Sequence, residues 1–135
     1  MRETIERSEM SKLSTAEREM YTEFMIEFRR CFACRYQPLP SIESGYPWVL
    51  ENCHIVGNSG RTHDRRNLVR LCKLHHLISH GSTFAECLNA KLTLENMLWL
   101  KQTFDEKYYD LEYLKSLRIK RHEPIEPMPL EPIGA

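Results

Sequence analysis

The chain has 135 residues, of which 41% are hydrophobic and 28% are charged. This length suits one compact domain with a modest core and excludes a large multidomain enzyme. No apolar run is long enough to span a bilayer, and the first residues lack the apolar stretch of a secretory signal, so we expect a cytoplasmic protein that does not enter membranes. The 19 basic residues balance the 19 acidic ones, which argues against nucleic-acid binding through total charge alone.

The first predicted element is a helix over about residues 14–30. Ser14 and Glu17 have the spacing of a capping box, which marks a helix start. Apolar residues at helical spacing predict the face of this helix that packs against the core. They are Met20, Tyr21, Phe24, Met25 and Phe28. The proline-rich stretch 35–47 that follows predicts an extended loop.

Two short strands and a helix are predicted next. Residues 48–56 and 67–71 are rich in β-branched and aromatic side chains, which favour strands, and residues 57–66 between them are rich in turn-forming types. The stretch 73–81 predicts one or two helical turns that end at Gly81.

The last third of the chain predicts more helices. Thr83 and Glu86 repeat the capping-box spacing, Thr93 is a plausible cap for a second helix, and Asp110 for a third that runs to about residue 120. The second helix has an apolar face, which predicts packing. That face consists of Leu94, Met97, Leu100, Phe104 and Tyr108. Proline-rich residues 123–135 predict an extended or disordered tail.

Metal-ligating residue types are concentrated in the middle of the chain. Four of the five cysteines and five of the six histidines lie between positions 31 and 80. Cys31 and Cys34, like Cys72 and His75, are separated by two residues, a spacing that lets both side chains of a pair reach one ion. The alternative is that these cysteines are ordinary buried thiols. We expect a closed tetrahedral Cys3His site for structural Zn²⁺, because this donor set suits zinc and leaves no open position for catalysis.

A second set of residues follows the same order along the chain: His54 near the end of the first strand, Asn67 after the turn, and His76 and His80 on the helix. Together with the Cys31 and Cys72 pairs, this order resembles the HNH endonuclease family over about residues 31–81. The resemblance implies an α+β fold with a zinc-stabilised ββα-metal, treble-clef-like core. Residues 1–30 would form an N-terminal helical extension, 82–122 C-terminal helices packed on the core and 123–135 a tail, all in a single globular domain.

The resemblance also implies a role for each matching residue. His54 matches the general base that takes a proton from the attacking water. Asn67 matches the residue that orients the base or ligates the metal. His76, with His80 one helical turn away, matches the ligand of a divalent ion such as Mg²⁺, Mn²⁺ or Ni²⁺. The partner would be DNA, cleaved by nicking or double-strand cutting with low sequence specificity, and small members of the family are often phage or bacterial proteins.

Two positions differ from the family pattern. His75 stands where a cysteine is commoner, which is harmless because imidazole binds zinc well. Cys53 stands before the base, where many members carry Asp or His as a metal ligand, and we expect it to be a plain buried thiol. This position keeps open an alternative function: a weak or inactive zinc-finger-type module that binds DNA or protein.

The balanced total charge conceals a basic stretch beside the histidines. It predicts contacts with the phosphate backbone and hence affinity that falls with salt. Its members are Arg61, Arg65, Arg66, Arg70 and Lys73, against a single acid, Asp64. Asp64 is expected to bond its own turn backbone, and His63 to be an exposed loop histidine.

Overall fold

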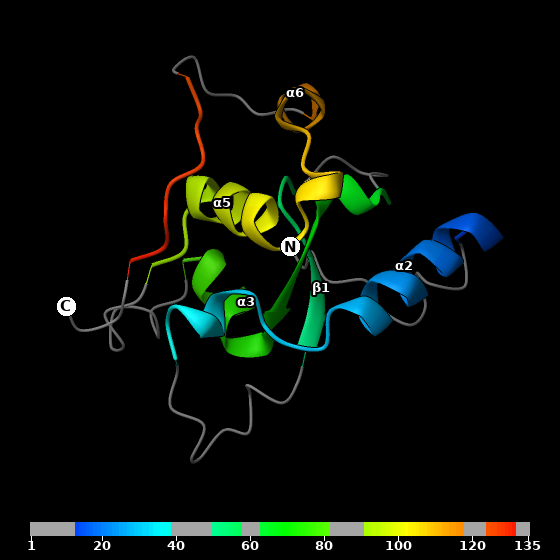
Figure 1. Ribbon diagram of the computed structural model, residues 1–135, viewed down its shortest axis with the longest axis horizontal. Helices are drawn as coiled ribbons and strands as arrows, with labels where there is room; N and C mark the ends of the chain where they lie inside the picture. The colour runs from blue at the N-terminus through cyan, green and yellow to red at the C-terminus, as the bar shows by residue number, and fades with distance from the viewer. Residues whose placement is uncertain (1–12, 39–49, 58–62, 82–90, 118–123, 132–135) are drawn as a thin grey trace.

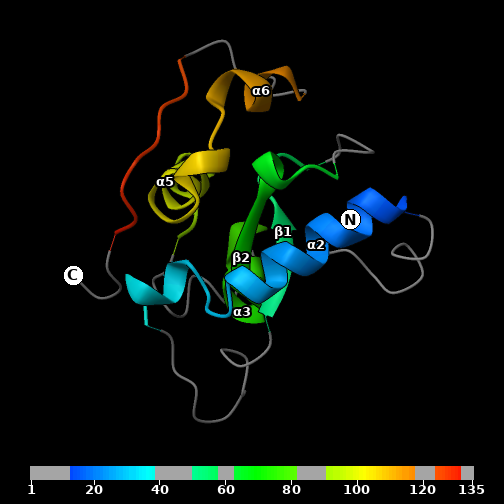
Figure 2. The same cartoon turned by 45° about the vertical axis from the view of Figure 1, so that its right-hand side comes forward.

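The fold is built around a two-stranded antiparallel hairpin. The computed structural model describes residues 13–38, 50–57, 63–81, 91–117 and 124–131. Strands β1 (Leu50–His54) and β2 (Leu68–Cys72) lie at the centre, with helices around them (Figures 1 and 2). The combination of helices with a small sheet confirms the predicted α+β class.

Helix α2 (Thr15–Glu27) starts where the sequence predicts. Ser14 Oγ accepts a hydrogen bond from the Glu17 N–H, and the Glu17 carboxylate accepts one from the Ser14 N–H, which completes the capping box. The helix ends three residues before the predicted residue 30, because the backbone at Phe28 is extended. The Phe28 carbonyl instead accepts a hydrogen bond from Arg70 Nε, which ties this end of α2 to β2.

The hairpin register pairs Leu50 with Cys72 and His54 with Leu68. Every residue of β2 is buried, and β1 is partly exposed, so the hairpin carries core side chains on both faces of β2. Arg70 is buried within β2 because its guanidinium donates to the side chain of Asn52, its partner across the hairpin.

Helix α3 (Lys73–Ser79) follows β2 without a loop. Its N-cap is Cys72, whose Sγ accepts a hydrogen bond from the His75 N–H. The helix is followed by Gly81 at φ +74°, a left-handed conformation that glycine adopts without strain, so the predicted stop is confirmed. The short 3-10 turn η1 (Ala33–Arg35) precedes the hairpin in the chain.

The C-terminal helices are shorter than the sequence predicts. Helix α5 (Leu94–Phe104) begins with a capping box between Thr93 and Asn96, and α6 (Leu111–Ser116) is capped by Asp110. Tyr108 lies in the separate turn η4 (Glu106–Tyr108), and α6 ends before residue 120. The short helix predicted from Thr83 lies outside the described residues.

The segment 124–131 is extended, as predicted, but it is packed rather than disordered. Ile125 and Leu130 are buried, and the Asn96 side chain donates to the carbonyls of Met128 and Pro129. Figures 1 and 2 show this segment running beside α5. The Asn96 side chain therefore ties this segment to α5.

A buried ion-pair network lies at the C-terminal end of α5. Lys101 is fully buried and its Nζ lies 2.6 Å from an Asp105 carboxylate oxygen, while Arg65 donates to both oxygens of Asp105.

None of the helices in the described part of the chain has the length and apolarity needed to cross a membrane.

Candidate metal centre and surrounding histidines

The four residues predicted as zinc ligands lie close together where β2 ends and α3 begins. Cys31 follows α2, Cys34 lies in η1, Cys72 ends β2, and His75 lies in the first turn of α3. One ligand atom from each lies within 4.8 Å of all the others, and three of the four residues are buried. The sequence spacing and the structure therefore select the same set.

The distances fit a tetrahedral metal ion. The Cys34 and Cys72 sulfurs are 3.7 Å apart, and His75 Nδ1 lies 3.4 to 3.5 Å from each of the three sulfurs. Zinc bonds of about 2.3 Å to sulfur and about 2.0 Å to nitrogen would place tetrahedral ligands about 3.8 Å (S–S) and about 3.5 Å (S–N) apart. The four residues can thus hold a metal ion, and the set is compatible with structural zinc.

Burial and mutual contacts shift the pKa values of the three cysteines in this set. Hydrogen bonds from Cys31 and Cys34 lower the pKa of Cys72, whereas burial raises the pKa of Cys31 to about 12. The neighbouring Cys31 and Cys72 thiols raise the pKa of Cys34. Metal ligation requires thiolates, so metal binding would release protons from this group of cysteines.

Gln37 is a residue near this site that the sequence pattern did not indicate. Its Oε1 lies 3.2 Å from Nε2 of His75, and its Nε2 donates to the Glu131 carbonyl at 2.6 Å. Gln37 therefore fixes the ring whose Nδ1 could bind a metal ion, and it connects the centre to the C-terminal segment.

His54 ends β1 and faces helix α2. Its Nε2 lies 3.4 Å from the Tyr21 hydroxyl, which lies 2.8 Å from Nδ1 of His63. Burial, followed by the charges of His63 and His76, lowers the pKa of His54 to about 4, so the ring is neutral at pH 7. His63 is half-buried and in contact with Tyr21, so the prediction of an exposed loop histidine was wrong.

Asn67 is fully buried and closes the loop between the strands. Its Nδ2 donates to the Val56 carbonyl at 3.1 Å, and its Oδ1 accepts from the Val56 N–H at 2.9 Å. Its backbone carbonyl also accepts from the Ile55 N–H. Asn67 therefore holds the two residues after His54 in place.

His76 on α3 contacts a residue that the motif did not include. Its Nδ1 lies 2.9 Å from a carboxylate oxygen of Glu51 on β1, and its ring lies 4.9 Å from the ring of His80. No sequence spacing predicts this contact, since it depends on the hairpin placing β1 over α3. Among the described residues, the Cys3His set is the only group of three or more potential metal ligands within bonding reach of one ion.

Cys53 is a buried thiol, as predicted. Its side chain is 1% exposed, and burial, followed by the charge of Glu51, raises its pKa well above the usual value. It does not belong to the Cys3His set.

The residues of the predicted basic stretch differ in how far they are buried. Arg65 is buried, and its guanidinium binds Asp105 and Glu27; Arg70 is buried against Asn52. Arg66 is partly exposed and bound to Asp64 and Asp110, and Lys73 is exposed.

Burial places Arg65 and Arg70 in structural roles, away from a backbone-binding surface. Their predicted role in binding phosphates is therefore not supported by their positions. Arg61 lies outside the described residues. Asp64 accepts a hydrogen bond from the Arg66 N–H, which confirms the predicted turn contact.

Comparison of the chain with protein-family models, with curated proteins and with solved structures gave no match.

Proposed function

We propose that the chain is an HNH-type endonuclease that hydrolyses DNA phosphodiester bonds with low sequence specificity and uses a divalent ion as well as structural zinc. The observation that carries the proposal is the order of β1, β2 and α3 around the Cys3His centre. In this order His54 ends the first strand, Asn67 closes the loop and His76 lies on the helix. This order supports the proposal because a ββα-metal core has its base, its asparagine and its metal-binding histidine in the same sequence along strand, loop and helix.

His54 is the proposed general base. Its neutral ring takes a proton from water, and the water oxygen forms a bond to phosphorus as the bond from phosphorus to the 3′ oxygen breaks. The 3′ oxygen takes a proton from solvent, which leaves a 5′-phosphate and a 3′-hydroxyl. The lowered pKa of His54 keeps the base unprotonated, though it also makes it a weaker acceptor than an exposed histidine.

His76 is the proposed ligand of the divalent ion. Because Nδ1 of His76 contacts Glu51, a metal on this ring would bind through Nε2, and His80 is near enough to assist. When bound, the ion supplies positive charge to the scissile phosphate and the leaving oxygen. Water and phosphate oxygens would complete its coordination, as is usual for Mg²⁺.

A second candidate function is a zinc module that binds DNA or protein without cutting. It is favoured by the burial of Cys53 beside the base, where it offers no ligand, and by the single complete metal-ligand group among the described residues.

Cleavage of supercoiled plasmid tests both candidates. With Mg²⁺, Mn²⁺ or Ni²⁺, we expect the wild type to nick or cut DNA and His54→Ala to be slower by about 100-fold or more. Zinc content and melting temperature of His54→Ala should match the wild type, which shows that the centre is intact. If the protein shifts DNA on a gel but does not cut it with any of the metals, the binding module is favoured. If both proteins cleave DNA equally fast, His54 is not the general base.

A further inference from the structure

A strip of aromatic side chains runs from the end of α2 to α5. Phe28 and Phe32 have ring centroids 5.0 Å apart, and Phe32 stacks on Phe104 at 4.9 Å. Tyr36 extends the strip between Phe104 and Trp99, 4.8 Å from the latter. Phe32 is buried, whereas Phe28, Tyr36, Trp99 and Phe104 are partly buried, so part of the surface of these four residues is exposed.

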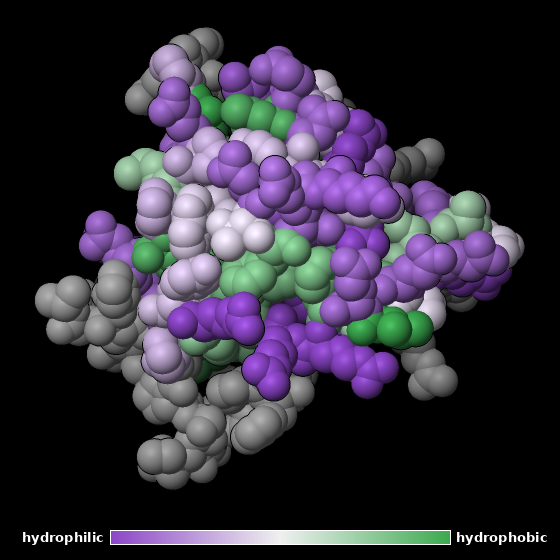
Figure 3. Space-filling view, in the orientation of Figure 1, coloured by the Kyte–Doolittle hydropathy of each residue, from purple (hydrophilic) through white to green (hydrophobic). Residues whose placement is uncertain are grey.

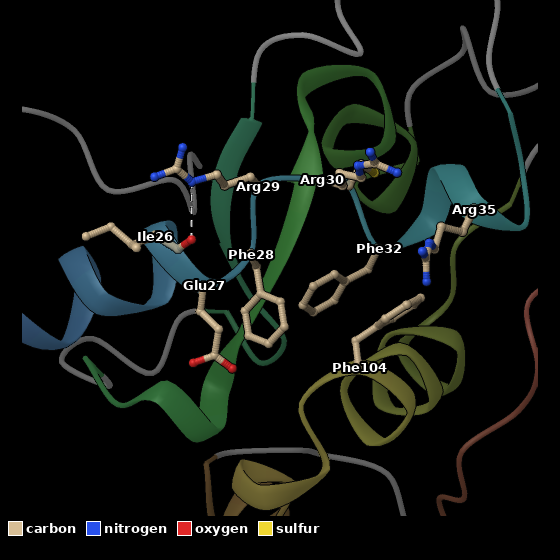
Figure 4. A pocket seen from close by; sticks show the side chains of 9 residues that line it. Ile26, Glu27, Phe28, Arg29, Arg30, Phe32, Arg35 and Phe104 are labelled. Atoms are coloured by element: carbon tan, nitrogen blue, oxygen red, sulfur yellow. Dashed lines mark hydrogen bonds between the residues drawn. The ribbon is translucent and has the colours of Figure 1, made fainter.

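A hollow of about 310 Å³ lies over one end of this strip. Figure 4 shows Phe28, Phe32 and Phe104 side by side within it, with Arg30 and Arg35 at one edge. Figure 3 shows the same face with weakly hydrophobic surface at its centre and strongly hydrophilic residues directly below.

The charge around the hollow is positive and uncompensated. Arg29, Arg30 and Arg35 are exposed, and no carboxylate of the described residues pairs with any of them. The Arg29 Nε donates to the Ile26 carbonyl, and the Arg35 guanidinium lies 5.6 Å from the centre of the Phe104 ring. Glu27, the carboxylate that lines the hollow, is bonded to Arg65 at 2.8 Å.

We infer that this aromatic and arginine-rimmed groove binds a single-stranded segment of nucleic acid. Partly exposed rings in a row give successive bases flat surfaces on which to stack, and unpaired guanidiniums beside them bind the phosphates between those bases. Duplex DNA offers no base faces, so the groove should discriminate between strand forms. Neither the sequence motifs nor the proposed cleavage reaction accounts for these residues.

Helix α2 connects the groove with the proposed base. Tyr21, which contacts His54, lies in α2, and Phe28, which lines the groove, is the residue directly after this helix. Binding itself needs no cleavage, so this inference and the proposed function can fail separately.

Fluorescence anisotropy of a labelled oligonucleotide of about 12 nucleotides, single-stranded or as a duplex, tests the inference. It is measured in the His54→Ala background without added divalent metal, so that no cleavage intervenes. Arg30→Gln with Arg35→Gln should weaken single-strand binding about tenfold or more and reduce the salt slope by about 1.4, that is about 0.7 for each phosphate contact on a single strand. Phe104→Leu should weaken it by about fivefold or more.

The matched control removes two positive charges from exposed positions elsewhere, through Arg18→Gln with Lys107→Gln. We expect it to retain nearly all single-strand affinity. The inference would be overturned if the control and the groove variants lost equal affinity, or if Arg30→Gln with Arg35→Gln left binding unchanged. Neither outcome depends on how Phe104→Leu affects stability. Displacement of the oligonucleotide by an equal charge concentration of polyglutamate would also overturn it, since that identifies a site for acidic peptides.

Discussion

Gln37 and His75 form a buried hydrogen bond that joins the segment after η1 to α3. The Oε1 of Gln37 lies 3.2 Å from Nε2 of His75, while Nδ1 of the same ring faces three cysteine sulfurs. When Nδ1 ligates a metal ion, Nε2 carries the hydrogen and donates it to Gln37, which fixes both the tautomer and the ring orientation.

Gln37→Leu should therefore weaken zinc binding by about 10- to 100-fold, measured by competition with a chromophoric chelator. Gln37→Glu keeps an oxygen acceptor for His75 but loses the donor to Glu131, so it should lower stability while retaining zinc affinity. Exposed Gln102→Leu on α5 is the control and should change neither. Wild-type affinity in Gln37→Leu would show that the contact does not orient the ligand.

Removal of one cysteine ligand tests the centre itself. Cys34→Ser should lose zinc and melt at a much lower temperature, because metal binding in small zinc domains supplies about 10–16 kcal/mol. Metal analysis and thermal unfolding measure the two effects. Cys53→Ala is the matched control, since it removes a buried thiol outside the ligand set and should retain a full equivalent of zinc. A full zinc content with unchanged melting in Cys34→Ser would contradict the assignment.

The buried carboxylate of Asp105 should be a strong determinant of stability. It binds both Arg65 and Lys101, and burial lowers the pKa of Lys101 to about 8 despite this pairing. Asp105→Asn leaves the buried Lys101 without its counter-charge and Arg65 with only the exposed Glu27, and should cost about 3–5 kcal/mol of unfolding free energy in urea titrations. Glu27→Gln removes the exposed partner of Arg65 and should cost less than about 1 kcal/mol. Similar losses in both variants would show that burial does not govern this network.

His54 should make stability depend on pH. Burial lowers its pKa from 6.5 to about 4 in the folded state, so the unfolded chain binds more protons between these values and folding weakens as pH falls from 6.5 towards 4. Between pH 7 and 5 the wild type should lose about 2 kcal/mol more unfolding free energy than His54→Gln.

Urea unfolding at both pH values measures this difference, and acid effects on the zinc ligands cancel because both proteins share them. His80→Gln, which removes an exposed histidine, should behave like the wild type. A His54→Gln variant as acid-sensitive as the wild type would rule out this contribution of His54.

The sequence predicted best those helix ends that depend on contacts between residues close together in the chain. Capping residues such as Ser14, Thr93 and Asp110 bind backbone groups within three positions, and Gly81 adopts a conformation that its own lack of a side chain permits. The helix ends at Glu27 and Phe104 were less predictable, because they depend on contacts with β2 and with the buried Asp105.

The sequence by itself determined the candidate metal-ligand set, because two-residue spacing lets both side chains of each pair reach a single ion. Only the tertiary structure decided what surrounds them. Gln37 reaches His75, Glu51 reaches His76, and Tyr21 lies between His54 and His63, each across 25 to 42 positions of chain. The same packing buries Arg65 and Arg70, although the charge pattern alone predicts that both contact phosphates at the surface. Such contacts depend on how helices and hairpin pack together, and no short-range pattern encodes them.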